Sequence, residues 1–369
     1  MAHGTKNLLG FALSGLALAA LAMPGQAEPY YKGKTITMIV GQTAGSGPDT
    51  QARFNARYME RVIEGNPTVI VRNVPGAQFQ RAQSIVHRAA PDGTTLYAGP
   101  WAWIDQVIGS KDLPFDYTEF TLVGGTQNIG RYYYMRTDAV PGGCKDPSDI
   151  ARNTDLKIGG AGPKAGFDIY SRLALEVLNL PYTYVVGYRG SDRKRQAVLQ
   201  NEINVDIESP AMWTTQVVPT MIQPGIACTL WAFPFPRDDG SLGPDPNFPD
   251  LPQFMDVYKK IAGRDTPSGI QWEAYRFSLG YTRVGHTVFG PPGMKAEALV
   301  PLRAGFLKMM LTDEYKTEAK KTFQVVPDPL TVAGGQKLID QLKTLSPELV
   351  AFLKDFIERG EGGHTYARR

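Results

Sequence analysis

The chain has 369 residues, of which 39 are Lys or Arg and 36 are Asp or Glu, so its formal net charge is +3. This balance gives no electrostatic case for a nucleic acid or an anionic membrane surface as a partner. The length is sufficient for two domains, each with its own hydrophobic core.

Residues 1–27 are typical of an export signal. Lys6 precedes an apolar stretch from Leu8 to Met23, which is shorter than the roughly 20 residues that span a bilayer. Small residues at Gly25 and Ala27 suit a signal peptidase, so we expect cleavage near Ala27 and a periplasmic location. An uncleaved membrane anchor is the alternative.

A strand, a glycine-containing loop and a helix open the remaining chain. The β-branched apolar run of residues 36–40 predicts a buried strand, and residues 50–61 have helical character. Pro48 suits the first turn of a helix, where its missing N–H would have no partner. The free N–H groups and the helix dipole make the loop of residues 41–49 a natural seat for a carboxylate or phosphate. An ordinary strand-to-helix connection has the same pattern.

Strand-like and helix-like runs then alternate along the chain, which favours mostly parallel sheets flanked by helices. Residues 156–166 repeat the strand and glycine loop, and an amphipathic helix follows over residues 167–179. Two such loops predict an α/β fold of two lobes that face one another, with one ligand in the cleft between them. Residues 233–252 are dense in Pro, Gly and Asp and predict a surface loop.

Cys144 and Cys228 are the only thiols of the chain. In an oxidising compartment they can form a disulfide, and two separate buried thiols are the alternative. No histidine lies near either cysteine at ligand spacing, so we expect no metal site. No cofactor is expected either.

Several segments together resemble one known family, the Bug receptors, which are periplasmic solute receptors of tripartite tricarboxylate transporters. The segments occur in family order from about Pro29 to Phe356, which is nearly the whole mature chain. They are residues 36–49, Arg72-Asn73-Val74-Pro75-Gly76-Ala77, Ala90-Pro91-Asp92-Gly93-Thr94-Thr95-Leu96, Gly160-Ala161-Gly162, Tyr188-Arg189-Gly190-Ser191 and Phe289-Gly290-Pro291-Pro292-Gly293.

The resemblance implies a two-lobed periplasmic-binding-protein fold of type II that closes on its ligand like a trap. Residues 28–126 together with about 232–369 would form the first lobe, and residues 127–231 the second. The ligand would be a small organic carboxylate, delivered by a monomeric receptor to the membrane subunits of a transporter. The sequence does not identify that carboxylate or those subunits.

In the resembled family, main-chain amides of the two glycine loops grip the carboxylate. By position these are Gln42, Thr43, Ala44, Gly45, Ser46 and Asp49 in the first loop, and Ala161, Gly162, Lys164, Ala165, Gly166 and Phe167 in the second. We expect Asp49 to accept backbone N–H groups rather than touch the anion. Pro48 and Pro163 each remove an amide from the loops. Lys164 either donates a charge-assisted bond to the carboxylate or is solvated at the loop edge.

Aromatic side chains around the loops are candidates for ligand specificity. Trp101 and Trp103 follow a strand end, and at that spacing both cannot share one face of a helix. We expect Trp101 to contact the ligand, with core packing as the alternative for both tryptophans. Tyr188 and the flat ring of Phe167 are further candidates, and such walls favour an aromatic or flat carboxylate.

The sequence gives little support to an exported enzyme. It contains no Gly-x-Ser-x-Gly elbow, phosphate-binding Walker loop or His-Glu-x-x-His motif. Its histidines, His3, His87, His286 and His364, have no nucleophile or metal partner beside them in sequence. We therefore expect a binding protein without catalytic residues. A receptor that reports its ligand to a signalling partner is the alternative to a transport receptor.

Overall fold

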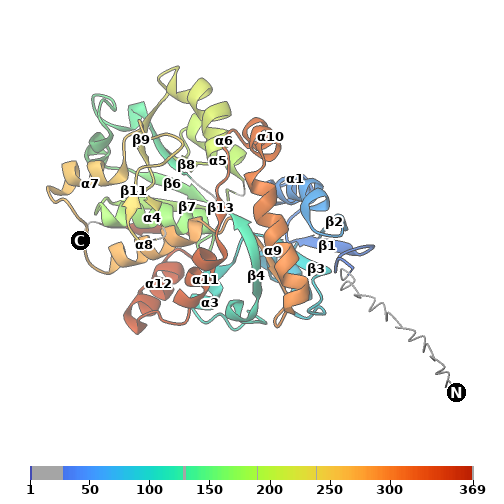
Figure 1. Ribbon diagram of the computed structural model, residues 1–369. Helices are drawn as coiled ribbons and strands as arrows, with labels where there is room; N and C mark the ends of the chain where they lie inside the picture. The colour runs from blue at the N-terminus through green and yellow to red at the C-terminus, as the bar shows by residue number, and fades with distance from the viewer. Residues whose placement is uncertain (2–27, 128–129, 189, 238, 368–369) are drawn as a thin grey trace.

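The computed structural model of the protein describes residues 1, 28–127, 130–188, 190–237 and 239–367 (Figure 1). The expected export signal and its cleavage site near Ala27 lie outside these residues, apart from residue 1. Within the described part, no helix is long and apolar enough to cross a bilayer.

Two six-stranded sheets organise the molecule. The first has the order β13-β4-β12-β3-β1-β2 and consists of β1 (Thr35–Val40), β2 (Thr68–Asn73), β3 (Thr95–Gly99), β4 (Thr121–Thr126), β12 (His286–Gly290) and β13 (Pro329–Leu330). The second has the order β14-β7-β6-β8-β5-β9 and consists of β5 (Tyr132–Arg136), β6 (Lys157–Gly160), β7 (Tyr182–Val186), β8 (Val205–Glu208), β9 (Ala227–Ala232) and β14 (His364–Tyr366). We call each sheet with its helices the first and the second lobe. A short hairpin, β10 (Phe235–Pro236) with β11 (Leu242–Gly243), lies within the expected surface loop.

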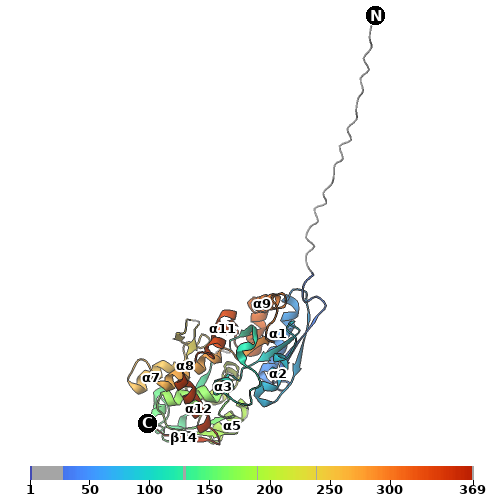
Figure 2. The same ribbon diagram turned by 90° about the horizontal axis from the view of Figure 1, so that it is seen from below.

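Helices cover both sheets. The first lobe has α1 (Gly47–Val62), α2 (Gln80–His87), α3 (Trp103–Val107), α9 (Ala296–Leu311), α10 (Asp313–Phe323) and α11 (Val332–Gln341). The second has α4 (Gly166–Val177), α5 (Ser191–Leu199), α6 (Pro210–Met212), α7 (Phe254–Ala262), α8 (Ile270–Thr282) and α12 (Pro347–Arg359), with a π-helix over Trp213–Ile222. In Figure 2, α7, α8 and α12 lie at the opposite end from α1 and α9.

The expected two-lobed α/β architecture is confirmed, but the sheets are mixed rather than mostly parallel. In the first sheet, β1 pairs in parallel with β2 and β3, whereas β12 runs antiparallel to both β3 and β4. In the second sheet, β6 pairs in parallel with β7 and β8, whereas β5 runs antiparallel to β8 and β9. The reason is that β5 and β12, the strands through which the chain enters from the other lobe, insert in the opposite direction.

The C-terminal strand corrects the expected assignment of residues 232–369 to the first lobe. Residues 364–366 form β14, which pairs antiparallel with β7 in the second sheet. Helix α8 packs on α4, and α12 packs on α8, so these helices also lie with the second lobe. The edge of β7 would otherwise expose unpaired backbone groups, and β14 covers it. The chain thus crosses between the sheets before β5, before β12 and before β14.

The predicted disulfide between Cys144 and Cys228 is confirmed. Cys228 lies on the edge strand β9, and Cys144 lies in the loop that follows β5. The bond therefore fastens a strand at the edge of the second sheet to a loop of the same lobe.

Candidate ligand-binding cleft

The second glycine loop connects β6 to α4 and is held by a buried carboxylate. Asp168, which is 3% exposed, accepts hydrogen bonds through Oδ2 from the Gly162 N–H and the Tyr184 hydroxyl, both at 2.9 Å. Gly160 packs so closely here that an added Cβ would lie 2.4 Å from that same oxygen. Burial raises the pKa of Asp168, although Lys194 and these hydrogen bonds oppose the shift. Hydrogen bonding rather than net charge thus fixes the loop.

The first glycine loop is also held by a buried carboxylate. Asp49 stands at the third position of α1, as Asp168 does in α4, and it accepts the Gly45 N–H at 2.8 Å. The expectation that Asp49 accepts a backbone N–H is confirmed. Burial disfavours its charged form, but bonds from Arg53, Gly45 and Asn73 outweigh burial and lower its pKa. Asp49 occupies the helix position whose side chain in a capping box accepts the N-cap N–H, but here it accepts the N–H of Gly45, one residue before the N-cap Ser46.

A cavity of about 620 Å³ lies where the second loop meets the first lobe. Its first-lobe wall includes Gln78, Gln80 and Asp105, and its second-lobe wall includes the segment 161–164. The remaining lining residues are Ala77, Ser110, Asp112, Val186, Gly187, Glu361 and Gly362. Of the predicted binding residues, this cavity collects Ala161, Gly162 and Lys164. Ala165, Gly166 and Phe167 follow directly in the chain and begin α4.

The first loop does not line this cavity. Between them stands the segment Ala77–Phe79, whose residues have φ values of 45°, 46° and 78°. Phe79 packs on Gly41 so tightly that a Cβ there would lie 2.8 Å from the Cβ of Phe79. Thr43, Ala44 and Gly45 are exposed, and Gln42 is partly buried. The Oγ of Ser46 is buried and finds no hydrogen-bond partner in the described part of the chain.

Lys164 and Asp105 form an ion pair across the cavity. The Lys164 Nζ lies 2.8 Å from Oδ1 of Asp105, and Gln80 donates to Oδ2 of the same carboxylate at 3.0 Å. Asp105 belongs to α3 of the first lobe and its side chain is only 2% exposed, whereas that of Lys164 is 28% exposed. The lysine that we expected at the ligand or in solvent thus joins the two lobes.

Replacing Lys164 by methionine is expected to favour separation of the lobes in the ligand-free protein. The variant loses a charge-assisted hydrogen bond, worth about 1.5–3 kcal/mol, and leaves Asp105 buried without its cation. Small-angle X-ray scattering should then give a larger radius of gyration than for the unaltered protein. Lys157→Met is the matched control, because Lys157 pairs with Asp155 within one lobe at 2.8 Å. Equal radii for all three proteins would show that this ion pair does not hold the lobes together.

The aromatic candidates separate into core and cleft residues. Trp101 is 5% exposed, donates from Nε1 to the Thr287 hydroxyl, and packs on Tyr117 and Phe289, so it matches the core-packing alternative. Trp103 is equally buried. Tyr188 is partly buried and bonds Glu202 at 2.9 Å. Phe167 is 38% exposed at the start of α4, and it remains the flat surface beside the second loop.

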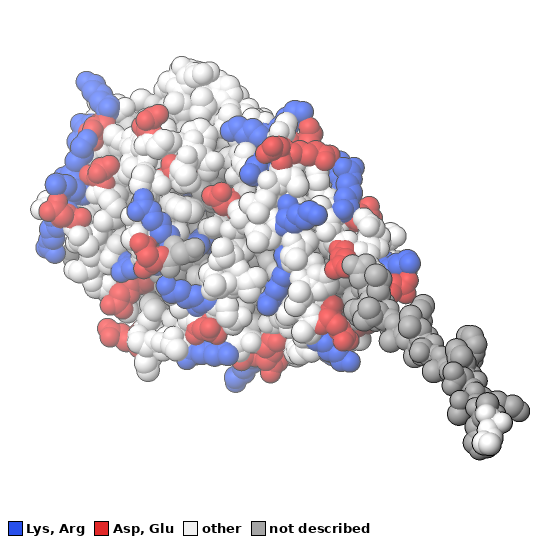
Figure 3. All heavy atoms as spheres, viewed as in Figure 1, with Lys and Arg blue, Asp and Glu red and all other residues white. Residues whose placement is uncertain are grey.

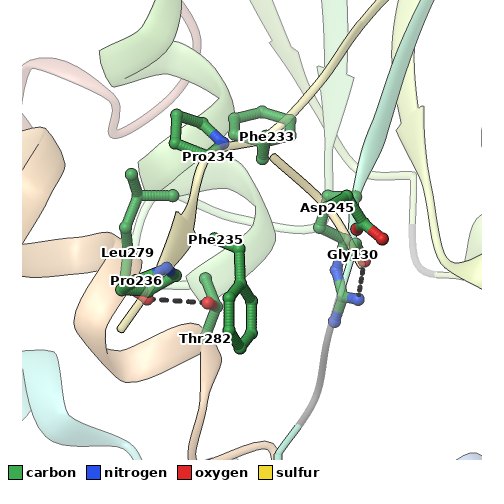
Figure 4. Close-up of a pocket in the computed structure, with 9 residues that line it drawn as sticks. Gly130, Phe233, Pro234, Phe235, Pro236, Asp245, Leu279 and Thr282 are labelled. Atoms are coloured by element: carbon green, nitrogen blue, oxygen red, sulfur yellow. Dashed lines mark hydrogen bonds between the residues drawn. The ribbon is translucent and has the colours of Figure 1, made fainter. Parts of the chain in front are cut away.

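Sequence reasoning missed Arg131, which immediately precedes β5. The residue is 2% exposed, and its guanidinium lies 4.2 Å from the centre of the Phe167 ring. It donates to the Gly130 carbonyl, while its Nε has no partner among the described residues. A short cavity of about 10 Å³ lies beside it, with Gly130 and Asp245 on one side and Pro236 and Thr282 on the other (Figure 4). A lone arginine outside any periodic pattern gave no sequence signal.

Comparisons with known proteins agree with this architecture. No protein-family model matches the chain. A UPF0065 protein of Bordetella bronchiseptica is 36% identical over 116 residues, covering 31% of this chain and 34% of the relative. A UPF0065 protein from the TAR-I ttuE–ttuC′ intergenic region of Agrobacterium vitis is 26% identical over 209 residues, covering 54% and 58%. The matches thus span about a third and somewhat over half of these curated relatives.

Solved structures match over most of the chain. The periplasmic binding protein BugD is 20% identical with a TM-score of 0.59, covering 88% of this chain and 98% of its own. MatC of Rhodopseudomonas palustris with bound malate is also 20% identical, with a TM-score of 0.58 and coverages of 88% and 99%. A TctC solute-binding protein from Polaromonas is 15% identical, with a TM-score of 0.63 and coverages of 89% and 99%.

The chain has the fold of the Bug and TctC periplasmic binding proteins. The fold implied by the family resemblance is therefore confirmed over almost the full length of these Bug/TctC-type structures. At these identities the likeness shows the fold and leaves the ligand open, so the ligand must be argued from the residues of this chain.

Proposed function

We propose that the protein is an extracytoplasmic receptor that captures a small organic carboxylate between its lobes and delivers it to a tripartite tricarboxylate-type membrane transporter. The observation that carries this proposal is the cavity of about 620 Å³ walled by both lobes, into which the second glycine loop opens. The first turn of α4 follows that loop and offers N–H groups without intrahelical partners, together with the positive end of the dipole. A malate-bound protein of the same fold supports a carboxylate as the ligand class.

Capture of a ligand requires the two lobes to move relative to one another, and the segments that connect the lobes can act as hinges. It passes between the sheets at three places, so closure is a hinge motion about these connections. The ion pair between Lys164 and Asp105 already bridges the two sides. On the face in Figure 3, Lys and Arg are interspersed with Asp and Glu, so no field of a single sign covers that face. We infer a monomeric, periplasmic receptor that makes and breaks no covalent bond.

Thermal unfolding of the purified protein in the presence of candidate ligands tests this proposal. A ligand that binds only the native state stabilises it by about 2.7 kcal/mol at 100 times its Kd, so the matching acid should raise the melting temperature clearly. The panel contains malate, citrate and benzoate, with benzamide, glucose and spermidine as uncharged and cationic counterparts. A shift with any of the counterparts and with none of the acids would contradict the carboxylate assignment.

A further inference from the structure

Arg131 is a buried cation for which the described part of the chain provides no ion-pair partner. Its side chain is 2% exposed, and no carboxylate in the described part of the chain forms an ion pair with it. Its guanidinium donates to the neutral Gly130 carbonyl and interacts with the neutral Tyr170 hydroxyl, while its Nε has no partner among the described residues. Stacking on Phe167 offsets only part of the cost of burying a charge without a counter-ion. Binding of an anion beside the guanidinium would therefore lower the cost of keeping Arg131 charged and buried.

The acid that shares the small cavity with Arg131 is already engaged elsewhere. Asp245 accepts the Asn247 N–H at 2.7 Å, the Phe248 N–H at 3.3 Å and the Tyr132 hydroxyl at 3.3 Å. Burial raises the pKa of Asp245 in spite of these bonds. Among the described residues, Asp245 makes these hydrogen bonds and forms no ion pair with Arg131.

Groups from both lobes surround Arg131. Phe167 lies under the guanidinium and belongs to the start of α4, next to the second glycine loop. His286 begins β12 of the first lobe, at the edge where β3 ends, because Thr287 pairs with Gly99. The Nδ1 of His286 is buried and has no hydrogen-bond partner among the described residues, and both burial and the charge of Arg131 lower the pKa of His286 to about 4. The imidazole is thus neutral and one of its nitrogens carries a proton to donate.

We propose that Arg131 holds a carboxylate of the captured ligand, with Nδ1 of His286 as a second donor from the opposite lobe. The planar guanidinium fork matches a carboxylate through two parallel hydrogen bonds. The cavity beside Arg131, about 10 Å³, is close to the smallest volume that holds one water, so the residues that line it must move before a ligand carboxylate reaches the guanidinium. This inference rests on the proposed function and adds to it the residue that neutralises the ligand.

Isothermal titration of malate and benzoate into the unaltered protein, Arg131→Met and Arg131→Lys tests the inference. For the acid that binds, we expect Arg131→Met to lower affinity by roughly 30-fold or more, because a buried charge partner is lost. Arg131→Lys keeps the charge but loses the fork, so an intermediate loss is expected. Arg193→Met is the matched control: it removes the same charge from an exposed arginine and should leave the affinity unchanged.

The unfolding midpoint of each ligand-free variant separates a binding role from a structural one. Removal of an unneutralised buried charge should leave the midpoint of Arg131→Met unchanged or raise it. The inference is overturned if Arg131→Met binds the acid within threefold as tightly as the unaltered protein. It is also overturned if the unfolding midpoint of Arg131→Met falls far enough to explain the lower affinity. Should Arg131→Met not fold, an unchanged affinity in Arg131→Lys overturns it. If no acid binds the unaltered protein, the proposed function itself fails, and this inference with it.

Discussion

Replacing Asp168 by alanine is expected to lower the free energy of unfolding by about 3–5 kcal/mol and to abolish ligand binding. The substitution leaves the buried Tyr184 hydroxyl and the Gly162 N–H without their acceptor, each at a cost of about 1–3 kcal/mol. It also takes a carboxylate away from the buried Lys194, whose charge acts on Asp168. Urea unfolding and titration with the acid identified by the thermal screen measure the two effects.

Asp168→Asn is the matched control for this prediction. Both hydrogen bonds end on Oδ2, so an amide oxygen placed there accepts both and only the charge is lost. Because burial raises the pKa of Asp168, its charged form is costly, and the asparagine variant should lose less than half as much stability as the alanine variant. Equal losses in the two variants would show that charge, and not hydrogen bonding, shapes the second loop.

The two glycine loops show which structural features can be predicted from the local sequence. A short strand-like run followed by a loop with Gly and Pro predicts a strand, a turn and a helix start within a few residues of one another, and both units lie where they were expected. The acceptor role of Asp49 was also predictable, since it depends on an N–H only four residues away. Each of these features is decided by neighbours in the chain.

Features that depend on distant segments were not predictable in this way. The tail residues 364–366 pair with β7 because that strand has a free edge, which its own sequence does not reveal. Trp101 is enclosed by Tyr117 and Phe289, so its surroundings are set by β12 and by the turn before β4. The burial of Arg131 requires α4, β12 and the segment around Asp245 together. Local patterns cannot distinguish such an arginine from a solvated one.

The ion pair of Lys164 in the cleft also depends on a distant segment. Its position in the second loop suggested a ligand contact, yet its ammonium lies on Asp105, which is 59 residues away and on the other lobe. Lys164, at the wall of the larger cavity, is thus paired with a carboxylate, whereas Arg131, beside the smaller cavity and stacked on Phe167, has no ion-pair partner among the described residues. Lys164 then acts mainly on lobe closure, and Arg131 acts on the recognition of the ligand's charge. Lys164→Met should therefore change the radius of gyration of the ligand-free protein, whereas Arg131→Met should change the affinity for the acid.

Reduction of the Cys144–Cys228 disulfide is expected to destabilise the second lobe by roughly 4 kcal/mol. The bond joins residues 84 positions apart, and closing a loop of that length restricts the unfolded chain by about this amount. The closed loop includes β6, the second glycine loop, α4, β7 and β8, so it contains the binding wall of that lobe. Urea unfolding with and without a reductant should therefore show a lower midpoint for the reduced protein.

The double variant Cys144→Ala, Cys228→Ala separates the bond from other effects of the reductant. It should unfold at the midpoint of the reduced protein and should not respond to the reductant. Bound acid should recover part of the lost stability, because the ligand contacts the lobe that the disulfide constrains. A reduced protein that unfolds at the same urea concentration as the oxidised one would mean that the unfolded second lobe is already compact, so that the cross-link restricts little.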